Sequence, residues 1–318
     1  MLSHSLIVYA PEVSLFKPIT RSATPTFLIL FGIMLEVAYL SKVRAGRSLL
    51  SARRRLLGKA ITCYLLFALI TLAAFVTGKL AVTETRDALL MSGGGRFGNI
   101  LTLYTAMFLI FFLAAPLVLR HGAPLLAGAA AICWLVSGIA ARGGLSDAYV
   151  LQYLLGHDAG RGPAVLLGLV LVAFGMFIGE ALTGRRSWHA AGAMLAGATT
   201  LLLHDAVTTA RSEGPKAFLS DLVYVYRGTN NPAYYAYGMI CAATYMLLFR
   251  YLGNTGVSRS FAALGWQTLF YYGFGNILLN LLPEYSAAFP FDVLIVAAFI
   301  GVLTALALDR ASVEPLQQ

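Results

Sequence analysis

Long apolar runs separated by short polar segments dominate this chain. Nine of the runs hold roughly 20 residues each, which is the length that a helix needs to cross the hydrocarbon of a bilayer. This pattern predicts an all-α fold, a polytopic transmembrane helical bundle with nine full spans. The predicted spans are residues 24–41, 56–79, 100–119, 122–141, 163–184, 188–204, 232–252, 260–283 and 289–309.

The first ten residues, MLSHSLIVYA, form a further apolar stretch that is too short to span a bilayer. The stretch has neither the basic leader nor the cleavage site of a signal peptide. We interpret it as the outer end of another helix, so the predicted fold gains an N-terminal partial helix. With no solenoid period, low-complexity tract or soluble domain in the sequence, residues 1–318 are predicted to form a single integral membrane domain.

The composition indicates the same class of protein. The chain is 59% hydrophobic and only 12% charged, whereas about a quarter of the residues in soluble domains are charged. Its mean hydropathy is +0.76. The net charge of +9 is explained by loops that face anionic lipid, so we expect a lipid bilayer and no nucleic acid as partner. All three cysteines fall inside predicted spans, where neither a disulfide nor a metal site is expected.

The distribution of basic residues predicts the orientation of the chain. Between Lys42 and Arg55 there are six basic residues and no acid. If the nine spans alternate in direction, the basic residues that follow later spans fall on the same face, and most acids fall on the opposite face. Because arginine and lysine gather on the cytoplasmic side, the C-terminus is predicted to be cytoplasmic. The later basic residues are Arg120, Arg185, Arg186, Arg250, Arg259 and Arg310.

Acids inside the predicted spans are candidates for chemistry, since a charge at the bilayer centre costs about 2.5–3.5 kcal/mol. Glu36 lies about 12 residues, or roughly 18 Å, into its helix and should face a cavity or a partner. Glu180 lies beside Arg185 and Arg186 near the cytoplasmic end of its span, where pairing explains it. Asp292 lies near the outer end of the last span, as either a functional acid or a charge favoured at a helix start.

Histidine suits a general base near neutral pH because its unperturbed pKa is about 6.5. His4 would lie where an upstream helix reaches the outer half of the membrane, and taken alone it is better explained by a position without a catalytic role. His204 is predicted to end a helix beside Asp205. Solvated or interfacial positions account for the other three histidines. The three are His121, His157 and His189.

Several segments have a recognisable order. His4 is followed by the phenylalanine-rich FLILFGIMLE of residues 27–36 and by the arginine-rich ARRRLLGKAI of residues 52–61. Further on come GNILTLYTAMFLIFFLAAPLVL, with Leu103, Tyr104 and Pro116, then YRGTNNPAYYAYG and ALGWQTLFYYGFGNIL. This order resembles the acyltransferase-3 superfamily of membrane acyltransferases, and within it the OpgC-type proteins that modify periplasmic glucans. The resemblance spans almost the whole chain, and its histidine and arginine features are the chemically specific ones.

The resemblance implies a membrane O-acyltransferase in the bacterial inner (cytoplasmic) membrane. It would move an acetyl or succinyl group from cytoplasmic acyl-CoA (acetyl-CoA or succinyl-CoA), without a metal, to a hydroxyl of a periplasmic or exported polysaccharide or glucan. His4 would deprotonate that hydroxyl, and Glu36 and Asp292 are the other candidate catalytic residues. The expected protein partners are a second copy of the chain, as a homodimer, or envelope glycan assembly proteins.

The arginine-rich loop is the candidate site for the CoA phosphates, because guanidinium groups make forked, charge-assisted hydrogen bonds to phosphate. A positive-inside anchor with no ligand explains each arginine equally well. The candidate CoA-binding residues are Arg47, Arg53, Arg54, Arg55 and Lys59, and the candidate substrate-binding residues are Tyr104, Trp266, Gln267 and Tyr271.

Two other functions fit the composition. The chain could be a non-catalytic transporter, or a polysaccharide-export component whose acyltransferase fold has lost its activity. Transporters commonly contain inverted repeats with broken helices. The sequence contains no convincing internal repeat, which favours the enzyme.

Overall fold

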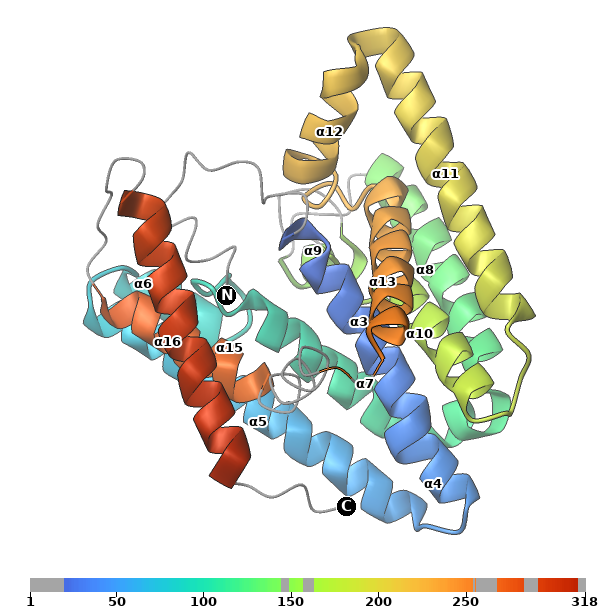
Figure 1. Ribbon diagram of the computed structural model, residues 1–318, viewed down its shortest axis with the longest axis horizontal. Coiled ribbons are helices and arrows are strands. Elements are labelled where there is room, and N and C mark those ends of the chain that lie inside the picture. The colour runs from blue at the N-terminus through green and yellow to red at the C-terminus, as the bar shows by residue number, and fades with distance from the viewer. Residues whose placement is uncertain are drawn as a thin grey trace. The chain divides into compact units, whose positions relative to one another are not determined.

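The computed structural model describes residues 20–143, 149–156, 163–253, 255, 268–282 and 291–313 (Figure 1). Within these ranges the protein is built of helices and turns without strands, so the all-α prediction is confirmed for this part of the chain. Each of the nine predicted apolar runs contains a helix. In chain order the helices are α3 (Ala23–Met34), η1 (Leu35–Leu40), α4 (Ser41–Arg44), α5 (Leu49–Val76), α6 (Val82–Leu89), α7 (Asn99–His121), α8 (Ala123–Gly143), α9 (Tyr149–Leu155), α10 (Leu169–Leu182), α11 (His189–Glu213), α12 (Pro215–Tyr224), α13 (Pro232–Leu252), α15 (Thr268–Leu281) and α16 (Phe291–Val313).

Four of the described helices are long and apolar enough to cross a membrane: Ala23–Arg44, Leu49–Val76, Asn99–His121 and His189–Glu213. In contrast, α10 has 14 residues, about 21 Å of helix, which is less than the hydrocarbon thickness. The structure therefore supports a membrane protein with four candidate spans, and nine full spans are not confirmed.

Helix α5 carries a continuous apolar stripe on its surface. Ile61, Leu65, Leu69, Leu72 and Val76 recur every three or four residues, and each is between 42% and 76% exposed. Residues at this spacing lie on one face of a helix. Soluble proteins rarely present a contiguous apolar surface of this kind, so the stripe is suited to lipid.

The chain forms two compact units, which divide between residues 20 and 21 and within α5, α7 and α13. In the unit made of residues 21–63 and 103–244, α10 is the central helix, with 11 of its 14 residues buried. Its main neighbour is α3, and the two helices touch through glycines. A Cβ added at Gly175 would lie 2.0 Å from the carbonyl oxygen of Ile29, and one added at Gly32 would lie 2.2 Å from that of Val172. The crossing is thus a contact of backbone on backbone.

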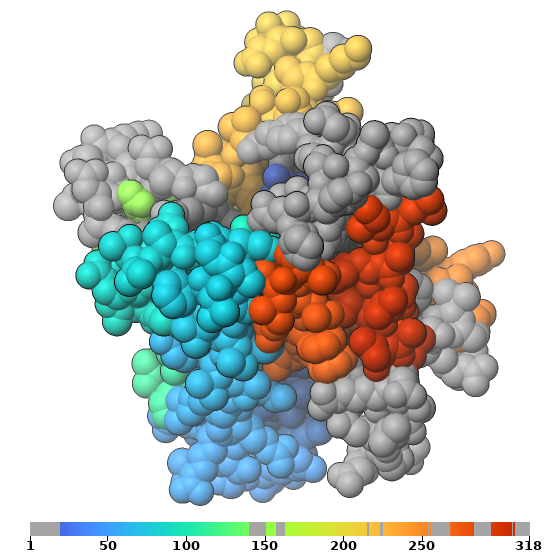
Figure 2. Space-filling view, turned by 90° about the vertical axis from the view of Figure 1, so that its left-hand side faces the viewer, coloured from blue at the N-terminus to red at the C-terminus, as the bar shows by residue number. Residues whose placement is uncertain are grey.

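The other unit comprises residues 1–20, 64–102 and 245–318. Its core contains Phe67 and Ile70 of α5, both fully buried. Along α15, the fully buried Asn276 and Asn280 each donate a hydrogen bond to a carbonyl one turn earlier, and Asn280 also donates to the carbonyl of Ile70 at 3.4 Å. Figure 2 shows α15 and α16 side by side on one face of the protein.

Three predicted spans have the wrong limits, and the run at 56–79 belongs to a helix that already begins at Leu49. The run at 163–184 becomes helical only at Leu169, because the amides of Ala164 and Val165 bond instead to the Asn230 side chain and the Tyr153 carbonyl. The run at 188–204 continues as α11 to Glu213. Polar residues after position 204 end the apolar run there but not the helix, which stops at Gly214 with φ +94°.

The longer course of α11 corrects the prediction that His204 ends a helix: His204 lies within α11 and its side chain is exposed. In this helix only Ala191 and Ala198 are buried. Figure 1 shows α11 and α12 as the two arms of a helical hairpin.

Candidate functional site

A concave pocket lies where the first candidate span meets the start of α5. It encloses about 240 Å³ of space, part of which is open to solvent. Gly46, with φ +100°, allows the tight turn that brings the two helices together. The pocket is lined by Ala38, Tyr39, Lys42, Val43, Arg47, Ser48, Ser51, Ala52 and Arg55.

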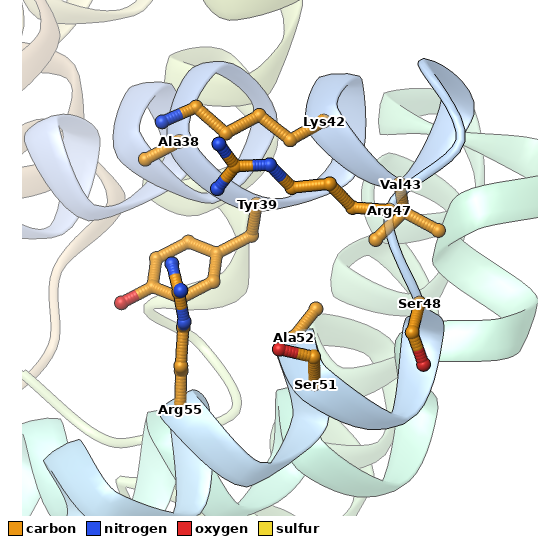
Figure 3. Close-up of a pocket in the computed structure, with 9 residues that line it drawn as sticks. All are labelled: Ala38, Tyr39, Lys42, Val43, Arg47, Ser48, Ser51, Ala52 and Arg55. Carbon is orange, nitrogen blue, oxygen red and sulfur yellow. The ribbon is translucent and has the colours of Figure 1, made fainter.

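Three cationic side chains converge on this pocket. Figure 3 shows Lys42, Arg47 and Arg55 extending toward the space beside the ring of Tyr39. Among the described residues, none of the three forms an ion pair. The hydroxyl groups of Ser48 and Ser51 line the same space, and the positive end of the α5 dipole adds to its potential. The arrangement is suited to bind an anion with several oxygen atoms.

Helical periodicity explains which residues at the start of α5 line the pocket. Ser48, Ser51, Ala52 and Arg55 recur at intervals of three and four residues, so they lie on one side of the helix. Lys59 follows Arg55 by one turn and does not line the pocket. Two more of the predicted CoA-binding residues, Arg53 and Arg54, are also absent from its lining. The structure therefore brings together only Arg47 and Arg55 of the predicted set.

Arg53 has a different partner. Its Nε atom donates a 2.9 Å hydrogen bond to the carbonyl of Phe112, and its guanidinium lies 4.7 Å from the centre of the Phe112 ring. Pro116 lies inside α7 and has no N–H, so the Phe112 carbonyl four residues earlier loses its helical donor. Arg53 satisfies that carbonyl and thereby binds α5 to α7. We assign Arg53 to the structure of the protein and not to the pocket.

Glu36 is fully buried and pairs with Arg44, which satisfies the prediction that this acid faces a cavity or a partner. Both terminal nitrogens of the Arg44 guanidinium donate to the carboxylate, with an Nη2–Oε2 distance of 3.0 Å for one bond. In an α-helix, residues i and i+8 are about 80° apart around the axis, whereas residues i and i+7 nearly align. The π-helical segment η1 adds one residue to a turn, and this brings Arg44 onto the face of Glu36.

Glu180 is also fully buried and pairs with Arg185 and Arg186, as the sequence predicts. The nitrogen–oxygen distances are 2.9 Å and 2.7 Å. The same carboxylate accepts a 3.0 Å hydrogen bond from the amide of Ala123. Gly122 has φ +70°, a backbone conformation that favours glycine, and a Cβ there would also lie 2.1 Å from Glu180 Oε1, so this turn between α7 and α8 needs glycine. Glu180 joins two helix ends and has no free oxygen for chemistry.

Two predicted substrate-binding tyrosines have structural contacts. The hydroxyl of Tyr104 donates a 3.0 Å hydrogen bond to the carbonyl of Phe27, and its ring packs against Phe31. The hydroxyl of Tyr271 lies 3.5 Å from that of Thr304, which joins α15 to α16. Neither side chain lines the described pocket.

The other predicted site residues fall largely outside the described part of the chain. His4, Trp266 and Gln267 lie outside the described residues. Asp292 is in the first turn of α16, the place where the helix dipole favours an acid, and its side chain lies outside what the structure describes. Elsewhere in the described ranges, no group of three His, Cys, Asp or Glu side chains is placed to hold a metal.

The tyrosines near residue 230 are mostly internal. Tyr234 and Tyr235 are at most 2% exposed; the first donates to the carbonyl of Arg21 and the second to Oδ1 of Asn230. Tyr226 is 7% exposed, and burial raises the pKa of its hydroxyl. These three rings therefore form part of the protein interior.

Sequence reasoning did not select Tyr39, Lys42, Ser48 or Ser51 as site residues. Lys42 was visible within the basic segment, and the spacing of Ser48, Ser51 and Arg55 was a usable signal of a shared helix face. Tyr39 had no such signal, because its position depends on the π-helical turn that precedes Lys42.

Comparisons of the chain with protein-family models, with characterised proteins and with solved structures give no match. The acyltransferase-3 assignment therefore stays a prediction from the sequence.

Proposed function

We propose that this protein is a membrane O-acyltransferase that takes an acetyl or succinyl group from acyl-CoA and transfers it to a hydroxyl of a periplasmic or exported polysaccharide. The observation that carries the proposal is the pocket in which Lys42, Arg47 and Arg55 converge without ion-pair partners among the described residues. Its cations and serine hydroxyls match the phosphate oxygens of CoA. The acyltransferase-3 resemblance supports the choice of CoA among phosphate-bearing ligands.

The proposed orientation places this pocket at the cytoplasmic surface of the bacterial inner membrane. The pocket belongs to the most basic segment of the chain, and such segments stay on the cytoplasmic side. CoA is a large anion that does not cross a bilayer, so its site must lie on that side. In this proposal the C-terminus is also cytoplasmic, and the acyl group reaches the acceptor through the helical assembly.

Replacing Arg47 and Arg55 together by alanine should weaken CoA binding by about 30-fold or more, since each charge-assisted hydrogen bond contributes about 1.5–3 kcal/mol. Isothermal titration calorimetry of CoA into the purified protein measures this. The matched control is Arg54→Ala with Lys59→Ala, which removes the same charge outside the pocket and should change the affinity by less than about threefold. Equal losses in both double variants would reduce the pocket to a general basic surface.

His4→Ala should abolish acylation of the glycan while leaving the protein inserted and abundant, because the proposed general base is removed. Mass spectrometry of envelope glycans from cells with wild-type or variant protein checks this. His204→Ala is the control, since His204 is exposed on α11 and has no proposed role in the reaction. Unchanged acylation in the His4 variant would remove His4 from the mechanism. Glycans that do not differ between cells with and without the protein would favour the non-catalytic alternatives.

A further inference from the structure

A row of exposed residues on α5 begins inside the cationic pocket. Ser51 and Arg55 line the pocket, and Gly58, Thr62 and Leu65 follow at alternating intervals of three and four residues. All five residues are exposed. Residues at this spacing lie along one side of a helix, so the row connects the pocket with the apolar stripe of α5.

Beyond Arg55 the row is open and largely apolar. A Cβ added at Gly58 meets no other atom within 4 Å. The hydroxyl of Thr62 donates a 2.9 Å hydrogen bond to the carbonyl of Gly58, so it needs no partner outside the helix. At about 1.5 Å per residue, Arg55 and Leu65 are roughly 15 Å apart along the axis, which is the thickness of the hydrocarbon in one leaflet. The row is therefore long enough to accompany a lipid chain from the pocket to the middle of a bilayer.

The length of α5 places the pocket at the depth of lipid headgroups. The helix has 28 residues, or about 42 Å, whereas the hydrocarbon of a bilayer is about 30 Å thick. About 12 Å of the helix, or roughly two turns, therefore extends beyond the hydrocarbon. The end that extends is the one with Arg53, Arg54 and Arg55, because charged side chains are costly in hydrocarbon. The pocket cations thus lie at the level of phospholipid phosphates.

We infer that the pocket binds the phosphate of an anionic phospholipid from the adjacent leaflet, and that an acyl chain of this lipid lies along the row from Gly58 to Leu65. The three pocket cations have no ion-pair partner among the described residues, so they favour a headgroup that brings only negative charge. A choline headgroup would add a positive charge beside them. The inference goes beyond acyl transfer: the lipid occupies the pocket in the membrane, and CoA has to displace it.

Three probes separate the headgroup from the chains. Dioctanoyl phosphatidylglycerol has both an anionic headgroup and chains, glycerol phosphate has the anion alone, and dioctanoyl phosphatidylcholine has the same chains with a cationic choline. Native mass spectrometry of the purified full-length chain in non-ionic detergent measures the affinity of each probe. We expect phosphatidylglycerol to bind at least about tenfold more tightly than either of the others, because only it uses both the cations and the apolar row. Equal affinities for the two dioctanoyl lipids would overturn the inference.

Gly58→Leu tests the path of the chain without touching a cation. The new side chain would fill the open surface next to Arg55, so phosphatidylglycerol should bind about fivefold more weakly, while inorganic pyrophosphate should bind as to the wild type within about twofold. Leucine also has the higher helix propensity, so the variant should fold. Gly128→Leu is the matched control, since Gly128 is likewise exposed, lies in α8 and has no atom within 4 Å of an added Cβ. It should change neither affinity.

Replacing Arg47 and Arg55 together by alanine tests the headgroup. Each cation near an anionic lipid contributes about fivefold in affinity, so this double variant should bind phosphatidylglycerol about 20-fold more weakly. It should also weaken pyrophosphate binding, in contrast to Gly58→Leu. Wild-type affinity of Gly58→Leu for phosphatidylglycerol, or an equal loss in Gly128→Leu, would show that the chain does not follow the row.

A competition measurement separates this inference from the proposed function. If phosphatidylglycerol binds and CoA displaces it, both are supported. If phosphatidylglycerol binds with the predicted differences between variants but CoA does not bind, the acyl-CoA proposal fails and the lipid site stands. If CoA binds and phosphatidylglycerol binds no better than glycerol phosphate, the lipid site is overturned and the acyl-CoA proposal stands. If the wild type binds neither, both are overturned.

Discussion

Replacing Gly175 by alanine should lower the free energy of unfolding by at least about 3 kcal/mol, the upper end of what overpacking of a core usually costs. The new Cβ would lie 2.0 Å from the carbonyl oxygen of Ile29. Both sides of this contact are helix backbone, so no flexible side chain can move to make room. The helices α3 and α10 would have to separate along the most extensive helix contact in their unit. Thermal unfolding of the purified protein in detergent, followed by circular dichroism, measures the loss.

Gly58→Ala is the matched control for this prediction. Gly58 lies in α5, and a Cβ added there meets no other atom within 4 Å. Because alanine has the higher helix propensity, this variant should be more stable than the wild type by about 0.5–1 kcal/mol. If Gly175→Ala unfolded at the same temperature as Gly58→Ala, the close crossing of α3 and α10 would be refuted.

Arg44→Leu should destabilise the protein by about 3–5 kcal/mol, because it leaves the carboxylate of Glu36 buried without a counter-charge. The free energy of unfolding, measured by titration with sodium dodecyl sulfate in mixed micelles, should fall accordingly. Combining Arg44→Leu with Glu36→Leu should recover most of the loss, since a buried ion pair replaced as a unit by apolar residues is often neutral.

Arg54→Leu provides the comparison for the Arg44 variant. Arg54 is exposed and forms no ion pair among the described residues, so its replacement should change stability by less than about 0.5 kcal/mol. Equal effects of Arg44→Leu and Arg54→Leu would contradict the buried ion pair. So would a double variant with Glu36→Leu that is as unstable as Arg44→Leu alone.

The two buried acids show how far the sequence could predict this protein. Glu180 and its arginines are five and six residues apart across one helix end, and that proximity was enough to predict their pairing. Glu36 and Arg44 are eight residues apart, a spacing that places them on different faces of a regular α-helix. Their pairing depends on the π-helical turn η1, which hydropathy and composition do not indicate.

The same distinction holds for the basic segment. Its charge alone predicted a cluster of cations at one helix start, and Arg47 and Arg55 do meet in the pocket. Charge could not separate Arg53 from its neighbours, because the difference lies in a distant residue. Pro116 was visible in the sequence as a helix-interior proline, but the arginine that would satisfy the carbonyl it frees could not be identified without the fold.

Hydrogen bonds determine where the helices begin and end, and the pattern of apolar residues does not show them. Residues 164–167 are as apolar as the helix that follows, and all but Leu166 are buried. The amides of residues 164–166 nevertheless bond to a side chain and to carbonyls from other segments, so this stretch is not part of α10. Hydropathy located the nine helical segments and left their ends uncertain by several residues.

The bond between Arg53 and the Phe112 carbonyl bears on how the protein can vary among its relatives. Arg53 is needed there because Pro116 leaves that carbonyl without a donor. A change that restores an amide at position 116 would close the helical bond and release the guanidinium. These two positions, remote in sequence, should therefore covary, with arginine at 53 inherited together with proline at 116 and lost with it.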